Sequence, residues 1–368
     1  MTEQTNVFKG IICSQCSGKL EFKPGQTSMV CPYCGKENAI EVQNDEVEEL
    51  DFSEYLDKLE NEAEATDVFH VKCDACGADV ELEENIVSDD CAFCGTPIVS
   101  KNGSHGKVIK PKAVLPFQNT RKEAKTSYKT WLKKLWFAPS GLAKSARQTE
   151  KLNGMYIPYW TYDTQTTTSY SGERGDNYTE QEQYTNDKGE TQTRTVTKTR
   201  WMYASGVVRK FFNDILVIAS NTLPIKYLRK LEPWDLSKLV NFEASYITGF
   251  KTEVYQVGLK EGFEMVKKEV DKPVKELIRK DIGGDKQRIH RYNIKFSEIT
   301  FKHILLPVWI SAYRYNGKVY RFLVNGSTGE VQGERPYSFW KIFFFVVGIL
   351  ALVGGSIAIY YYLNQEGS

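Results

Sequence analysis

All eight cysteines of the chain fall in Cys-x-x-Cys pairs, and this spacing constrains the fold more than any other feature. The pairs make two copies of one module, each with fourteen residues between its pairs, and the copies begin sixty residues apart. In a reducing compartment such pairs are typical of metal sites and not of disulfides. We therefore predict a duplicated four-cysteine zinc ribbon. Its ligands would be Cys13, Cys16, Cys31 and Cys34 in the first copy, and Cys73, Cys76, Cys91 and Cys94 in the second.

The local sequence around the cysteines agrees with this prediction. Two Cys-x-x-Cys turns that face each other complete a tetrahedron with Zn–S distances of about 2.3 Å. Gly35, Gly77 and Gly95 follow their pairs and let the backbone turn back, and Ser17-Gly18 is the near-equivalent. Four thiolates leave no open position on the metal, so we predict two structural Zn²⁺ ions. Iron in a sulfur-only site remains the chief alternative.

The net charge of +1 conceals a strong division of charge along the chain. Residues 1–100 contain 22 of the 47 acidic and six of the 48 basic side chains, so they are acidic and the rest is basic. A ribbon that grips phosphates needs basic side chains. The second ribbon instead offers acidic ones, namely Asp74, Asp79, Glu81, Glu83, Glu84, Asp89 and Asp90. We predict protein-docking ribbons that reach out on their linker. Folding back of the ribbons onto the body, and nucleic-acid binding by the protein, are the alternatives.

The C-terminal end contains 22 consecutive uncharged residues, from Ile342 to Leu363. At about 1.5 Å per residue a helix of this length crosses a hydrocarbon core of roughly 30 Å. We predict one transmembrane helix over 340–363. Arg335 and Lys341 precede it, whereas residues 364–368 contain no basic side chain. The basic flank predicts a single-pass cell-membrane protein with a cytoplasmic N-terminal bulk and a short external tail, whose basic body contacts an anionic inner leaflet.

The middle of the chain, residues 107–337, is expected to form an α+β body. We predict helices over 121–136 and 258–280, and strands near 155–162, 288–300, 303–315 and 318–324. The strand cores 156–160 and 305–309 are similar in sequence, which indicates a duplicated unit of one helix and one antiparallel hairpin. The Thr-rich segment 161–200 has a period of two in polarity and predicts a projecting hairpin that is polar on both faces.

The predicted organisation therefore runs from two ribbons to a membrane helix. Its parts are ribbon 1 over 8–40, an acidic helical linker over 41–67, ribbon 2 over 68–100, the body over 107–337, the span over 340–363 and the tail over 364–368. We favour a solvated linker helix over a dedicated partner helix.

The chain lacks a phosphate-binding GxxxxGK[ST] loop and the HExxH and GxSxG motifs, so we expect no enzyme and no small-molecule substrate. The four histidines form no motif, and His70 is not expected to be a ligand.

The order of these features resembles a bacterial family of zinc-ribbon, C-terminally membrane-anchored proteins. The residues that carry the resemblance are CSQC…CPYC, CDAC…CAFC, IPYW, LPVW and VNGSTGEVQGERP before the span. Members often carry labels such as primosomal-helicase-like or transcription-factor-type zinc ribbon protein, and the missing phosphate loop argues against a helicase. The resemblance implies partners of the phage-shock protein A and SPFH (flotillin-like) types, which such a protein recruits to the membrane during envelope stress.

Overall fold

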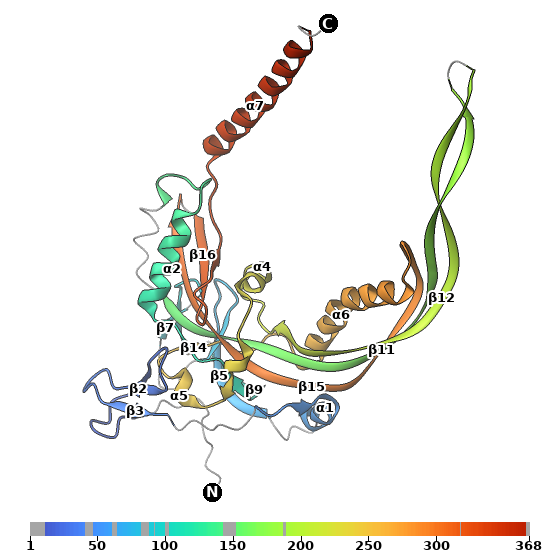
Figure 1. The fold of residues 1–368 in the computed structure, drawn as a ribbon. Helices are drawn as coiled ribbons and strands as arrows, with labels where there is room; N and C mark the ends of the chain where they lie inside the picture. Colours follow the sequence, from blue (N-terminus) through green and yellow to red (C-terminus); the bar gives the residue numbers. More distant parts are fainter. Residues whose placement is uncertain are drawn as a thin grey trace.

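The computed structural model describes residues 12–40, 47–60, 65–81, 88–91, 93–99, 103–142, 152–186, 189–316 and 318–365. The fold is mixed α+β, as predicted, with two cysteine clusters and one C-terminal apolar helix (Figure 1). The main helices are α1 (Phe52–Glu60), α2 (Arg121–Lys133), α6 (Leu259–Ile282) and α7 (Phe339–Gln365). The large strands of the body are β11 (Asn153–Thr185), β12 (Thr191–Ile218), β15 (Lys286–Tyr315) and β16 (Lys318–Asn325).

The body is built around the antiparallel pair β11–β15, in which Ile157 lies opposite Leu306. The two similar sequence blocks thus lie side by side and run in opposite directions. The far edge of β11 pairs with β12, and that of β15 with β16, so each half contributes a hairpin. A short parallel strand adds to each half as well, namely β14 (Lys251–Thr252) on β11 and β10 (Ala113–Val114) on β15. The arrangement has pseudo-twofold symmetry about the Ile157–Leu306 pair.

Backbone hydrogen bonds repeat between the two halves and confirm the duplication. In each half, the residue that follows the second hairpin strand makes two backbone hydrogen bonds. Its N–H donates to the carbonyl of the proline in the first strand, and its carbonyl accepts from the N–H of a residue that precedes a helix. The matching bonds are Ala219 N to Pro158 O (3.0 Å) and Gly326 N to Pro307 O (2.8 Å), and Gln256 N to Ala219 O (2.7 Å) and Gln118 N to Gly326 O (2.9 Å). The repeat therefore includes the short strand before each helix, which the sequence comparison did not detect.

The two faces of the sheet carry different cores. Because side chains alternate along a strand, Tyr156 and Trp160 lie on one face and Ile157 and Tyr159 on the other, all fully buried. The first face is covered by α2, α6, α1 and ribbon 1. The opposite face is covered by ribbon 2 and by the short helix α4 (Ile225–Leu228) with the turn that follows it. Both ribbons thus belong to the cores of the body.

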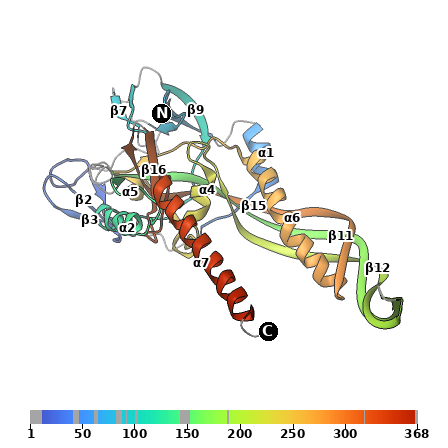
Figure 2. The same cartoon turned by 90° about the horizontal axis from the view of Figure 1, so that it is seen from above.

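The projecting hairpin differs in part from its prediction. Strands β11 and β12 form a curved arm, and α6 lies along its concave side (Figures 1 and 2). The inner part of β15 belongs to the same curved sheet and pairs with the other edge of β11. Tyr170 and Val208 are buried in the core that contains α6, and Thr166 and Thr168 are buried on the same face, so one face of the inner arm is covered. Pairing with β15 ends at Gly175 and Lys286, and only the outer arm is polar on both faces. The tip of the hairpin includes residues 187 and 188, which lie outside the described part.

Two further boundaries differ from the expectations. The strands predicted over 288–300 and 303–315 are one continuous strand, β15, which contains a bulge where Glu298 has a φ of 50°. A bulge bends a strand without ending it. It also interrupts the alternation of polar and apolar side chains, and in the sequence this interruption resembles a loop between two strands. Helix α2 ends at Lys133, three residues before the expected end at residue 136, and Leu135 is buried after the helix has ended.

Candidate metal centres

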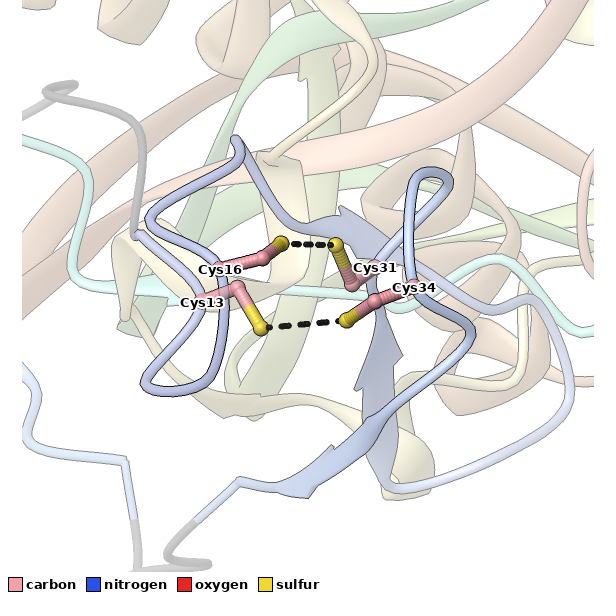
Figure 3. A group of neighbouring side chains, drawn as sticks. All are labelled: Cys13, Cys16, Cys31 and Cys34. Carbon is pink, nitrogen blue, oxygen red and sulfur yellow. Dashed lines mark hydrogen bonds between the residues drawn. The ribbon is translucent and has the colours of Figure 1, made fainter.

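The first cysteine group lies between two turns of ribbon 1 that face each other (Figure 3). Cys13 Sγ is 3.6 Å from Cys34 Sγ, and Cys16 Sγ is 3.4 Å from Cys31 Sγ. All four sulfur atoms lie within 4.8 Å of one another. A tetrahedron with Zn–S bonds of about 2.3 Å has sulfur atoms about 3.8 Å apart. The four sulfurs thus have the size and shape of a metal-binding tetrahedron, which needs only slight expansion to admit an ion.

The second group repeats this geometry in ribbon 2. Cys73 Sγ is 3.7 Å from Cys94 Sγ, and Cys76 Sγ is 3.6 Å from Cys91 Sγ. The Cys94 thiol also lies 3.2 Å from Thr96 Oγ1, and this hydroxyl can donate to the sulfur once it is a thiolate. The structure therefore brings together all eight predicted ligands in the two predicted groups, and both can hold a metal ion.

All four cysteine turns have the same backbone hydrogen bonds. The first cysteine of each turn accepts at its carbonyl from the residue four positions later and donates from its amide to the residue after that. The four pairs of bonds are Ser17 N to Cys13 O (2.9 Å) with Cys13 N to Gly18 O (2.7 Å), Gly35 N to Cys31 O (2.9 Å) with Cys31 N to Lys36 O (3.0 Å), Gly77 N to Cys73 O (2.8 Å) with Cys73 N to Ala78 O (2.8 Å), and Gly95 N to Cys91 O (2.8 Å) with Cys91 N to Thr96 O (2.9 Å). The four turns thus share one backbone conformation, which directs the cysteine side chains of each pair toward the facing pair.

These turns require a left-handed residue directly after the second cysteine. Gly35, Gly77 and Gly95 have φ values of 73°, 75° and 73° there, and a glycine adopts such values at no steric cost. In the first turn this position is Ser17, with a φ of 58°, and Gly18 is one residue too late to serve. Ribbon 1 therefore carries a strained serine where the other three turns have glycine.

Hydrogen bonds also prepare some of the sulfurs for metal binding. The Gln15 and Cys16 amides lower the pKa of the Cys13 thiol to about 6, and Gln15 N lies 3.4 Å from Cys13 Sγ. In ribbon 2, the hydrogen bond with Cys76 lowers the pKa of Cys91 to about 5, and the same bond raises the pKa of Cys76. One sulfur of each group is thus readily a thiolate, the form that binds metals.

Ribbon 2 is held on the body by backbone and side-chain contacts. Val80 in β6 (Asp79–Glu81) forms a β-bridge with Glu253, and Val254 N donates to Asp79 O at 3.2 Å. Lys251 Nζ lies 2.7 Å from Asp89 Oδ2, and it also donates to the carbonyl of Asp90. The ribbon is therefore fixed to the central strands of the body. The expectation that both ribbons reach out on their linker is wrong, and the alternative that they fold back on the body is right.

A buried carboxyl group lies at this junction. Glu253 is 2% exposed and accepts hydrogen bonds from the hydroxyls of Ser220 and Thr222. Burial raises the pKa of Glu253 to about 8. Nothing in the spacing of the sequence distinguishes this glutamate from those on the surface.

Ribbon 1 docks on a different part of the body. Phe22 N donates to Thr248 O at 3.0 Å, and Gly25 N donates to Phe117 O at 2.8 Å. The Phe22 ring packs against Tyr246, with 5.6 Å between ring centroids. In contrast, Tyr33 is 78% exposed on a cysteine turn of this ribbon. The docked face is apolar, and the metal turns keep one side open to solvent.

The linker helix is packed against the body, which corrects the preference for a solvated helix. Phe52 and Tyr55 of α1 are buried against Phe301, and Lys302 Nζ forms an ion pair with Glu49 at 2.8 Å. The apolar residues of this segment are spaced as on one face of a helix, but the acidic residues around them favoured a solvated helix over a packed one. Residues 41–46 and 61–64 of the predicted linker lie outside the described part.

The histidines lie apart from the sulfur groups. His70 Nδ1 is 2.6 Å from Asp79 Oδ1, so its nearest polar partner is a carboxylate. His303 is buried, its Nδ1 lies 2.8 Å from Ile109 O, and burial lowers its pKa to about 4. His303 is therefore a neutral core side chain.

The N-terminal end of helix α7 contacts the turn that follows α2. Lys341 Nζ donates to the carbonyl of Ala138 at 2.8 Å, and Ser338 N donates to Phe137 O at 2.7 Å. The Phe137 ring also packs edge-on against Phe345, with 5.2 Å between centroids. Residues 339–359 are apolar and none of this stretch is buried, so the helix is long enough to span a membrane. Its attachment to the body was not foreseen, because the sequence of the 134–138 turn has no recognisable pattern.

The comparison with known proteins finds one named relative. The chain is 28% identical to the "Uncharacterized protein YdjG" of Bacillus subtilis (strain 168) over 242 residues, which cover 66% of this chain and 68% of that protein. No protein-family model matches the chain, and no solved structure matches it.

Proposed function

We propose that this protein is a membrane-tethered scaffold that holds partner proteins at a membrane surface and has no catalytic role. The observation that carries the proposal is the apolar helix α7, in which none of the residues 339–359 is buried and which is joined by hydrogen bonds to the body that holds both cysteine groups. A helix of this kind needs a lipid environment. Four sulfurs fill each metal-binding tetrahedron and leave no position at which a reactant could bind.

Zinc is the metal that we propose for both groups. Sulfur-only tetrahedral sites suit zinc and also iron. Zinc has no redox chemistry, and a structural role is sufficient for ribbons that form part of the body's core. Each ion would stabilise its ribbon and the contacts that the ribbon makes with the body.

We propose that the bulk of the protein is cytoplasmic. Arg335 and Lys341 flank the N-terminal end of α7, and basic residues favour the cytoplasmic side. Lys341 Nζ donates to backbone carbonyls of the body, and in this proposal its charge would lie near the lipid headgroups. The basic rear part of the chain would lie near anionic lipids of the inner leaflet. A cytoplasmic location also agrees with cysteines that are reduced and free to bind metal.

Partner recruitment is the functional part of the proposal, and envelope stress is its proposed context. The resemblance in sequence suggests phage-shock protein A and SPFH-type proteins as partners. Ribbon 1 offers a surface of suitable chemistry, because Ile12 is 67% and Tyr33 78% exposed beside the half-open sulfur group. Aromatic side chains such as that of Tyr33 are enriched at protein–protein interfaces relative to the rest of the surface.

The test combines two variants of the full chain in bacterial cells. Deletion of 339–365 should leave partner capture intact but move the captured partner from the membrane fraction to the soluble fraction. The double variant Ile12→Ser with Tyr33→Ser should keep membrane location and metal content but lose the partner. The proposal is wrong if deletion of the helix alone abolishes capture, or if the double variant captures the partner as well as wild type does.

A further inference from the structure

The outer end of the arm is a two-stranded hairpin that no further strand covers among the described residues. From Asp176 to Thr185, β11 pairs only with β12, because pairing with β15 ends at Gly175. The opposite edge of β12 has no partner strand among the described residues. Asn177 N on the β11 edge donates to Asp285 Oδ2. Beyond this residue, both edges present backbone N–H and C=O groups that a further strand could pair with. A two-stranded ribbon is marginally stable in water, and additional strands stabilise it.

Charges on this outer arm are separated by strand. Residues 176–185 of β11 contain acidic side chains and no basic one, whereas residues 191–200 of β12 contain basic side chains and no acidic one. The acidic side chains are Asp176, Glu180 and Glu182, and the basic ones are Arg194, Lys198 and Arg200. The arm therefore has one acidic edge and one basic edge.

The register of β11 and β12 places all six charged side chains on one face of the hairpin. Asp176 lies opposite Arg200 and Glu182 opposite Arg194, and side chains two residues apart share a face. Lys198 Nζ is 2.9 Å from Glu180 and 2.7 Å from Glu182. Acidic and basic side chains thus already match across the hairpin in this register, and the same match is possible with a strand on the outside.

Two tyrosines extend the pattern. Tyr178 and Tyr184 point to the charged face and are 41% and 37% exposed. The guanidinium of Arg200 lies 5.5 Å from the ring centroid of Tyr178, and that of Arg194 lies 5.3 Å from Tyr184. Each acidic strand therefore also carries aromatic rings that arginine side chains of a basic strand can cover.

We propose that arms of neighbouring copies of this chain pair edge to edge, with the acidic β11 edge of one copy against the basic β12 edge of the next. β11 runs toward the tip and β12 runs back, so this pairing is antiparallel when both arms point in the same direction. Copies anchored in one membrane share a direction, and in this respect the inference rests on the proposed function. Two acidic or two basic edges repel each other, which sets the alternating order.

The test uses a charge swap that keeps the hairpin intact. Glu180→Lys and Glu182→Lys are combined with Arg194→Glu and Lys198→Glu in the full chain. The net charge of each outer strand then changes sign, while Asp176 and Arg200 stay and the pairs within the hairpin remain. Wild-type and swapped chains, each with two different affinity tags, are co-expressed in all combinations and purified in detergent. Protease resistance of the arm checks that the swapped hairpin is folded.

The pairing predicts that wild type co-purifies with wild type and swapped with swapped. Mixed pairs should fall to the background of an untagged control, because like charges then face each other. Equal recovery of mixed and matched pairs would show association through another surface, such as α7, and would overturn the inference. Failure of either matched pair would overturn it too. Membrane fractionation of the same cells tests the anchor separately, since loss of arm pairing leaves the protein in the membrane fraction.

Discussion

Trp160 and Trp309 occupy equivalent positions in the two halves of the body, and each indole donates a hydrogen bond to the segment that precedes the other half's helix. Trp160 Nε1 donates to Val257 O at 2.8 Å, before α6, and Trp309 Nε1 donates to Asn119 Oδ1 at 2.7 Å, before α2. The halves are therefore interlocked across the β11–β15 pair and are expected to unfold as one unit.

Replacement of these tryptophans should have unequal effects. Trp160→Phe leaves a buried backbone carbonyl without a donor, which costs about 1–3 kcal/mol of unfolding free energy. Trp309→Phe should cost less, because the Asn119 side chain can turn to a new partner. The control is Trp136→Phe, which is 76% exposed and should change stability by less than about 0.5 kcal/mol. Denaturant unfolding in detergent measures the order, and equal losses for the two core tryptophans would contradict it.

The contact between Lys251 and Asp89 should stabilise the docking of ribbon 2. Both side chains are about one-third exposed or less (27% and 33%), so the ion pair is screened, and Lys251→Ala should cost about 1 kcal/mol. The loss should appear as faster amide exchange in β7 (Ser88–Asp90) and faster metal release to a chelator. Lys23→Ala removes the more exposed pair with Glu37 in ribbon 1 and should leave these rates unchanged. Identical behaviour of the two variants would count against docking.

Stability should depend on pH through Glu253. Burial raises its pKa from 4.5 to about 8 in the folded protein. The stability that its neutral form contributes is thus fully present below 4.5 and is lost as the pH rises through about 8. Glu253→Gln stays neutral, so its stability relative to wild type should increase between pH 6 and pH 9. Melting temperatures of both proteins across this range measure the effect, and a constant difference would refute it.

The cysteine groups were predictable because metal ligation demands a fixed spacing. Cys-x-x-Cys turns allow few backbone conformations, so the pairing of Cys13 with Cys34 and the left-handed glycines follow from local sequence. The similar strand cores likewise predicted the duplication, since buried strands of equivalent position require similar side chains.

Docking of the ribbons was not predictable in the same way. The Val80–Glu253 bridge uses backbone groups, which every residue has, and buried Glu253 resembles any surface glutamate in the sequence. The Phe52 and Tyr55 stripe of α1 was visible, but its acidic neighbours favoured a solvated helix. Long-range contacts of this kind depend on shape, and shape is set only when the whole chain has folded.

The central claim is that two structural zinc centres sit on a membrane-tethered body. Elemental analysis of the full-length protein, purified in detergent without added metal, tests it most directly. The account predicts two zinc ions per chain, and one per chain after Cys73→Ser with Cys91→Ser. Iron in place of zinc, or one ion or none in the wild-type protein, would contradict it.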